Sequence, residues 1–164
     1  MTDQRVLDDL AIRNLTNAYS HACMRLDWVA AAAVYAEDGV LSAFSGPDIV
    51  GRPAIEKAFK RVLEPNQFLI QTCAAGMVDV QGDAARASWS VSDWFQAKTS
   101  EDLSCCFGVY EDQLKRTAEG WRFARRRFSP LHLASFPAKN RRQAPPEAFI
   151  NTYAPWPFVG VGAG

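Results

Sequence analysis

Asp93 is the residue of this chain whose position best fits proton-transfer chemistry. It ends the segment of residues 84–93, where strand alternation places it on one face with two alanines, Trp89 and Val91. A carboxylate on an otherwise apolar face is costly unless it is paired, and its pKa should be perturbed, which suits a general base. The alternative is an aspartate near a strand end that faces solvent or pairs with a surface arginine.

Arg126 is the second candidate, because it is the middle residue of three consecutive arginines. Side chains alternate between the faces of a strand, so Arg126 points away from Arg125 and Arg127, which then form a solvated face. A guanidinium inside the protein needs an anion, and Asp93 or a substrate oxygen is the natural partner. The alternative is a purely structural pair between Arg126 and a carboxylate.

Tyr19 and His132 are supporting candidates. A buried phenol needs a partner for its hydroxyl, which either a ligand or the backbone of the core can supply. His132 shares the parity of Arg126, although Pro130 can shift the register of the strand. Imidazole titrates near neutrality, so His132 at a pocket mouth could act as acid or base. A histidine at a strand end is otherwise structural or exposed.

Three helices and a short strand are expected to come first along the chain. Thr2 or Asp3 can cap a helix that runs to about residue 23, and Asp27 can cap a second helix over residues 28–35. Glu37-Asp38-Gly39 should end that helix, with a short strand over residues 40–44. Pro53 opens a third helix that ends at Leu63.

The remainder of the domain reads as β-structure. Four long segments joined by turns are expected to be strands, at residues 68–80, 84–96, 104–115 and 121–133. Long antiparallel strands after a helical half predict an α+β fold and not a parallel doubly wound sheet. We expect one domain over residues 1–134. Residues 135–164 form a tail with proline and aromatic residues, which should pack over a pocket mouth in the same chain or on a neighbouring subunit.

Composition excludes several classes of partner. The 164 residues carry 18 basic and 18 acidic side chains, which argues against a nucleic-acid surface. No run of residues is long and apolar enough for a membrane span, and the N-terminus lacks a signal sequence, so we expect a cytoplasmic protein. The four cysteines show no C-x-x-C spacing, and only His21 and His132 are available, so neither a metal nor another cofactor is expected.

Short motifs in a fixed order give the chain a family resemblance. They are Leu26-Asp27-Trp28, Tyr35-Ala-Glu-Asp38, Val50-Gly51-Arg52-Pro53, Tyr110-Glu-Asp-Gln-Leu114 and Gly120-Trp121-Arg-Phe123. Together they resemble the SnoaL-like branch of the nuclear transport factor two-like superfamily, from about Val6 to Leu133. The resemblance implies a cone-shaped half-barrel, in which a curved, mostly antiparallel sheet and N-terminal helices enclose one hydrophobic pocket. It does not specify a reaction.

The resemblance also assigns positions around that pocket. The dehydratases and dehydrochlorinases of the family carry an Asp–His pair where this chain has Met24 and Gln71, and neither of these can transfer a proton. A relocated base is therefore expected, with Asp93 as the candidate and Tyr19, Arg126 and His132 in support. The other expected lining residues, which suggest a flat aromatic ligand, are Phe59, Val62, Leu63, Phe68, Cys73, Trp89, Cys106 and Phe128.

Two functions from different classes remain open. The first is a cofactor-independent lyase that acts on a small hydrophobic, aromatic hydroxylated substrate, by dehydration or by retro-aldol-type cleavage such as formaldehyde loss from a lignin-type diol. The second is a noncatalytic small-molecule binding protein, or a structural subunit like the small subunit of ring-hydroxylating dioxygenases. The resemblance further implies a homo-oligomer, with a trimer favoured.

Overall fold

A computed structural model describes residues 3–42 and 45–138 of the chain. It contains three helices, α1 (Asp3–Met24), α2 (Trp28–Ala33) and α3 (Arg52–Leu63). The six strands are β1 (Tyr35–Ser42), β2 (Ile49–Val50), β3 (Asn66–Gln81), β4 (Ala84–Ala97), β5 (Asp102–Thr117) and β6 (Gly120–Pro137). No helix among these residues is long and apolar enough to cross a membrane.

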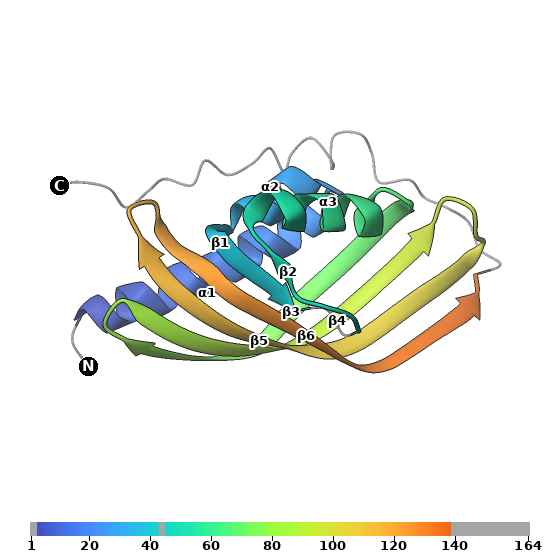
Figure 1. The fold of residues 1–164 in the computed structure, drawn as a ribbon. Coiled ribbons are helices and arrows are strands. Elements are labelled where there is room, and N and C mark those ends of the chain that lie inside the picture. Colours follow the sequence, from blue (N-terminus) through green and yellow to red (C-terminus); the bar gives the residue numbers. More distant parts are fainter. Residues whose placement is uncertain (1–2, 43–44, 139–164) are drawn as a thin grey trace.

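The strands form one curved sheet in the order β2-β1-β6-β5-β4-β3. All neighbouring strands are antiparallel except β1 and β6, which run parallel. The sheet curves like an open bowl, and the helices lie over its concave face, with α1 beside β3 (Figure 1). The expected α+β fold with a curved, unclosed sheet is therefore confirmed.

The three helices and the long strands match their expected positions to within about four residues, whereas the first strand begins five residues earlier than expected. Helix α2 ends at Ala33, and residues 37–39 lie inside β1 instead of ending a helix. Tyr35 is fully buried and pairs with Phe123 of β6, so burial on the sheet outweighs the turn signal of these residues. Gly39 fits this pairing because a Cβ there would lie 3.0 Å from the carbonyl oxygen of Phe123.

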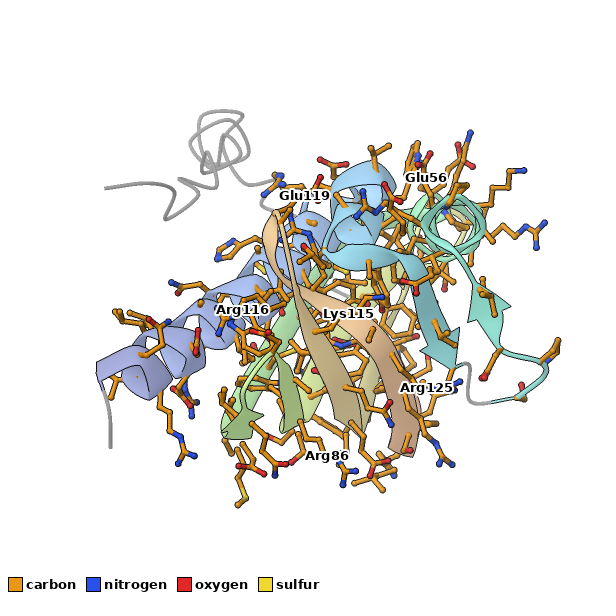
Figure 2. The ribbon with its side chains drawn as sticks, turned by 60° about the vertical axis from the view of Figure 1, so that its left-hand side comes forward. Glu56, Arg86, Lys115, Arg116, Glu119 and Arg125 are labelled. Carbon is orange, nitrogen blue, oxygen red and sulfur yellow. The ribbon has the colours of Figure 1, made fainter. Side chains whose placement is uncertain are left out.

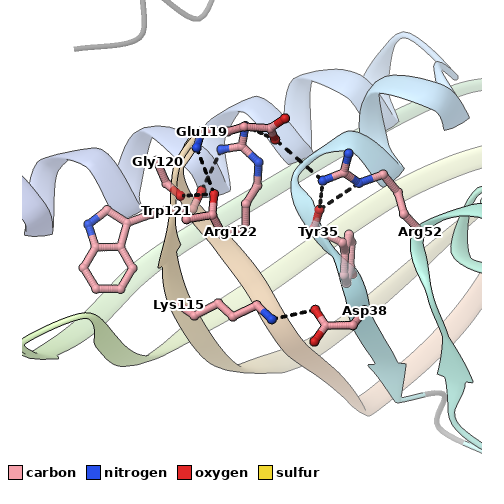
Figure 3. A network of polar contacts seen from close by, with 9 residues as sticks. Tyr35, Asp38, Arg52, Lys115, Glu119, Gly120, Trp121 and Arg122 are labelled. Atoms are coloured by element: carbon pink, nitrogen blue, oxygen red, sulfur yellow. Dashed lines mark hydrogen bonds and ion pairs between the residues drawn. The ribbon is translucent and has the colours of Figure 1, made fainter. Parts of the chain in front are cut away.

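Arg52, the first residue of α3, fixes this helix over the sheet. Its guanidinium donates two hydrogen bonds, of 3.0 and 2.8 Å, to the carbonyl oxygen of Tyr35 in β1. It also lies 3.8 Å from the carboxylate of Glu119, in the turn between β5 and β6, where Arg122 donates to the same carboxylate (Figure 3). One side chain thus links α3, β1 and the β5–β6 turn, and the helix is held above the concave face.

The C-terminal boundary differs from the expectation. Strand β6 continues through Pro137, so residues 135–137 extend the sheet and do not begin a separate tail. The predicted packing of the tail concerns residues 139–164, which lie outside the described part of the chain.

Candidate active site on the concave face

Alternation along four neighbouring strands brings a set of polar side chains to the concave face. Trp89 and Val91, which share the parity of Asp93, are buried in the core together with Tyr19 of α1. Gln71 of β3 is the cross-strand partner of Asp93 in β4, so their side chains leave the sheet on the same face. The polar residues of this face are Gln71, Asp93, Tyr110, Asp112 and Arg126.

Asp93 combines burial with an unsatisfied oxygen. Its Oδ1 is buried and has no hydrogen-bond partner among the described residues. Burial raises the pKa of Asp93 to about 6, and only the nearby Gln71 amide opposes that rise. The carboxylate therefore does not point to solvent. A base with this pKa is largely ionised at neutral pH yet holds a proton more readily than an exposed aspartate.

Tyr110 and Tyr19 extend this polar site toward α1. The Nε2 of Gln71 donates to the hydroxyl of Tyr110 at 3.2 Å, and the hydroxyls of Tyr110 and Tyr19 lie 3.4 Å apart. Burial raises the pKa of both phenols well above the usual value. They stay protonated and can donate a hydrogen bond. Tyr19 thus finds its hydroxyl partner in Tyr110, a residue that the sequence analysis did not include in the site.

Arg126 pairs with Asp112 and not with Asp93. Its Nε and Nη2 each donate to Asp112 at 2.7 Å, and the indole Nε1 of Trp89 donates to the same carboxylate at 2.9 Å. Asp112 is the register partner of Arg126 across β5 and β6, which explains this choice. Burial lowers the pKa of Arg126, but the ion pair with Asp112 more than offsets it, so the guanidinium remains charged.

Aromatic rings surround the guanidinium of Arg126. Its Cζ lies 4.6 Å from the ring centroid of Tyr19, 4.3 Å from that of Tyr110 and 3.8 Å from that of Phe123. The side chain is fully buried, yet its Nη1 has no partner in the part of the chain that the structure describes. One strong donor is therefore left for a ligand oxygen or a buried water.

His132 lies on the opposite face of the sheet, so its expected place at the pocket mouth is wrong. Gly108 pairs with Pro130, but Phe107 pairs with His132, so Leu131 is an extra residue in β6. Such a bulge reverses the alternation of side chains. The exposed imidazole stacks against Phe107, with ring centroids 6.3 Å apart.

Two of the expected lining residues also lie elsewhere. Leu69 and Gln71 of β3 point toward the concave face. Phe68 directly precedes Leu69, so alternation places its side chain on the outer face of the sheet, the face on which His132 lies. Val62 is 62% exposed on α3 and faces solvent.

The other expected lining residues lie on the concave side. Phe59, Leu63 and Trp89 belong to the buried core, and Met24, Cys73 and Phe128 pack against it. Cys106 is the cross-strand partner of Asp93. Burial raises the pKa of Cys23, near Tyr19, to about 12, so this thiol is not a nucleophile at neutral pH.

A separate hollow lies on the outer face and does not belong to this site. It is an open groove of about 810 Å³ lined by charged residues that include Asp79, Arg86, Glu111, Arg125 and Arg127. Arg86 lies at the lower edge of Figure 2, away from the helices, and Arg125 lies at the lower right. Among residues 3–42 and 45–138, no group of three or more acidic, histidine or cysteine side chains is arranged to hold a metal ion.

The fold agrees with proteins of one family. The chain matches the SnoaL-like domain model over residues 4–127. No protein with a curated description matches the sequence at a significant level.

Several solved structures share the architecture. A proposed aromatic ring hydroxylase from Novosphingobium aromaticivorans is 25% identical, with 80% of this chain and 94% of the other covered and a TM-score of 0.74. A proposed scytalone dehydratase from the same species is 19% identical, with 87% and 100% covered and a TM-score of 0.77. A hexachlorocyclohexane dehydrochlorinase is 15% identical, with 87% and 96% covered and a TM-score of 0.75. Since the family model covers most of the chain, the protein belongs to the family of SnoaL-like domains.

Proposed function

We propose that the protein is a cofactor-independent lyase that acts on a small hydrophobic, aromatic hydroxylated substrate. The observation that carries the proposal is Asp93, whose buried Oδ1 has no partner and whose pKa is raised to about 6. A buried carboxylate oxygen that no described residue satisfies is expected to serve a ligand.

The surrounding groups fit an elimination. In a dehydration, Asp93 takes a proton from a carbon next to a carbonyl or electron-poor ring, and that bonding pair becomes the new double bond. The hydroxyl on the neighbouring carbon leaves with its bonding electrons and takes from Asp93 the proton that the carboxylate had removed, so water is released and Asp93 is ionised again. Tyr110 and Tyr19 can donate hydrogen bonds to the leaving oxygen, and the free Nη1 of Arg126 can stabilise developing negative charge.

Carbon–carbon cleavage uses the same groups. Here Asp93 takes the proton of a hydroxyl group, a carbonyl forms at that carbon, and the adjacent carbon–carbon bond breaks. Its electron pair remains on the other fragment, which is then protonated by the carboxylic acid of Asp93. Loss of formaldehyde from an aromatic 1,3-diol has this form.

Relatives support elimination chemistry, and one pair of positions favours the alternative. Two of the similar structures are described as a dehydratase and a dehydrochlorinase, and both names denote eliminations. The alternative, a noncatalytic binding protein, is favoured by Met24 and Gln71, which stand where the lyases of the family carry their Asp–His pair. Turnover decides between the two.

The test is an assay of the purified protein with aromatic β-hydroxy carbonyl compounds and aromatic 1,3-diols. We expect an alkene with release of water, or formaldehyde with a shortened aromatic product, detected by mass spectrometry. Activity should survive exhaustive dialysis against a chelator, since every proposed step uses side chains alone. Activity that is lost and then restored by zinc or iron would contradict the cofactor-independent mechanism. Tight binding without turnover would favour the binding protein.

We also propose that copies of the chain associate through the outer face of the sheet. Trp94 and Phe107 are each 36% exposed there, with ring centroids 6.1 Å apart, and Ile70, the cross-strand partner of Trp94, is 49% exposed. The neighbouring groove contains both basic and acidic residues, so two such faces can complement each other. A trimer remains the favoured assembly.

The four cysteines are free thiols, which fits the predicted cytoplasmic location.

Light scattering tests this association. The wild-type protein should have the mass of a trimer, and Trp94→Glu should reduce it toward that of a monomer, because a charge would be buried in the contact. Val62→Glu, an equivalent change on the exposed surface of α3, should leave the mass unchanged. A monomeric wild-type protein, or a Trp94→Glu variant that stays assembled, would contradict the proposal.

A further inference from the structure

The hydroxyl of Tyr35 is buried without a hydrogen-bond partner among the described residues. The side chain of Tyr35 projects from β1 into the core and is fully buried there. Burial raises the pKa of Tyr35 well above its usual value, so the phenol stays protonated. Its O–H is therefore a donor that costs folding stability unless an acceptor is supplied from outside the chain.

The position of Tyr35 is held from two sides, so its hydroxyl cannot easily turn toward another partner. Arg52 donates two hydrogen bonds to the carbonyl oxygen of Tyr35, which fixes the backbone (Figure 3). The ring packs against the rings of Tyr19, Phe59 and Phe123, at centroid distances of 6.5, 5.9 and 5.5 Å. The hydroxyl is thus presented at a defined place on the concave side of the sheet.

A second donor without a partner, Nη1 of Arg126, lies in the same part of the core. The rings of Tyr19 and Phe123, which contact Tyr35, also lie 4.6 and 3.8 Å from Cζ of Arg126. The charge of Arg126 opposes the effect of burial on the pKa of Tyr35. The two donors do not bond to each other, since both atoms lack a partner. An acceptor oxygen in this region could satisfy both.

The charges of this region determine which kind of oxygen it can bind. Asp112 balances the charge of Arg126, and both side chains are fully buried. Asp93 contributes a further negative charge when it is ionised. An anionic ligand oxygen would therefore bring an uncompensated charge into a buried site, which is costly. A carbonyl oxygen is neutral and has two lone pairs and no hydrogen, so it matches two donors better than a hydroxyl group does.

We propose that the hydroxyl of Tyr35 and Nη1 of Arg126 form a subsite for an uncharged carbonyl oxygen of the ligand. The proposal rests on the proposed function for the aromatic nature of the ligand, and it narrows the substrate class to β-hydroxy carbonyl compounds. During dehydration the two donors stabilise the negative charge that develops on this oxygen. The total charge of the site stays the same in that step, because Asp93 is neutralised by the proton it takes.

Binding of two aromatic probes of similar size tests the proposal. Acetophenone has a carbonyl oxygen that ethylbenzene lacks, so the wild-type protein should bind acetophenone more tightly by a factor of about 10–100 in calorimetric titration. Benzoate carries a charge and should bind more weakly than acetophenone at neutral pH. Acetophenone that binds no more tightly than ethylbenzene, or benzoate that binds most tightly of the three, would overturn the proposal.

A variant of Tyr35 identifies the donor. Tyr35→Phe keeps the ring and removes only the hydroxyl, so the affinity for acetophenone should fall by roughly 3- to 10-fold and that for ethylbenzene should not change. Ser42→Ala is the matched control, because Ser42 is also buried in β1 but its hydroxyl accepts a hydrogen bond from Arg125 at the outer groove. It should change neither affinity.

An unchanged affinity for acetophenone in Tyr35→Phe would overturn the role of Tyr35, and its hydroxyl would then serve a buried water only. If Tyr35→Phe does not fold, the comparison of the probes in the wild-type protein decides.

These readouts separate the subsite from the lyase function. Selective binding of acetophenone together with no turnover on any substrate would remove the lyase function and leave the carbonyl subsite established. Turnover by a protein that does not distinguish acetophenone from ethylbenzene would do the reverse.

Discussion

Replacing Asp93 with asparagine is expected to lower turnover by a factor of about 10²–10⁴, the contribution that general-base catalysis typically makes. Asparagine keeps the size of the side chain and one hydrogen-bond acceptor but cannot take a proton. Because nothing else in the site changes, the dissociation constant of the ligand should stay close to that of the wild-type protein. Steady-state kinetics and calorimetric titration with the same compound measure the two quantities.

The pH dependence provides a second readout of the same variant. The base acts in its ionised form, so kcat/KM of the wild-type protein should fall as the pH decreases through about 6, the raised pKa of Asp93. The residual activity of Asp93→Asn should lack this step.

Ionisation of Asp93 should lower the folding stability of the protein, although the same ionisation raises its activity. The pKa in the folded state, about 6, lies above the ordinary value of 3.8, so the folded protein binds this proton more tightly than the unfolded chain. The resulting stabilisation is fully present below pH 3.8 and is lost as the pH rises through about 6. Asp93→Asn should not show that loss, so its stability relative to wild type should increase toward neutral pH.

Asp79→Asn is the matched control for these measurements, because Asp79 is exposed in β3. It should leave turnover and its pH profile unchanged. Near wild-type turnover in Asp93→Asn would remove Asp93 as the base. His132 is not a substitute, because it lies on the outer face, and the binding-protein alternative would then be favoured.

Sequence alternation was sufficient to predict most of the sheet and part of the site. The four long strands, with their turns, follow directly from hydrophobic pattern and turn residues, and the parity of residues 84–93 places Asp93 on the buried face. The same alternation places the side chain of Arg126 on the opposite face of the sheet from those of its two arginine neighbours. These features depend on local pattern alone, which a single sequence contains.

The partners of these residues depend on register, which local pattern does not contain. Asp112 is bonded to Arg126 because β5 and β6 pair at those positions, and Tyr110 reaches Gln71 through the pairing of three strands. The extra residue at Leu131 reverses the parity of His132, and Pro130 was only a weak signal of that bulge. Applying the alternation of β5 from Leu114 back to Asp112 and Tyr110 would have identified both missed residues.

The ion pair of Arg126 and Asp112 carries the largest expected effect on stability. Both side chains are fully buried, and Asp112 also accepts the indole hydrogen bond of Trp89. Asp112→Asn should lower the free energy of unfolding by about 3–5 kcal/mol, because it leaves the guanidinium buried without a counter-charge. The measurement is urea unfolding followed by circular dichroism.

A double variant distinguishes the lost charge balance from lost packing. Arg126→Met with Asp112→Leu removes both charges and keeps much of the buried volume, so it should be clearly more stable than Asp112→Asn alone. Asp9→Asn is the control, since the Asp9–Arg13 pair is 37% and 39% exposed on α1. It should change the free energy of unfolding by less than about 0.5 kcal/mol. If Asp112→Asn were no less stable than this control, the buried pair would not hold β5 and β6 together. Arg126 would then be free to turn its whole guanidinium toward a ligand.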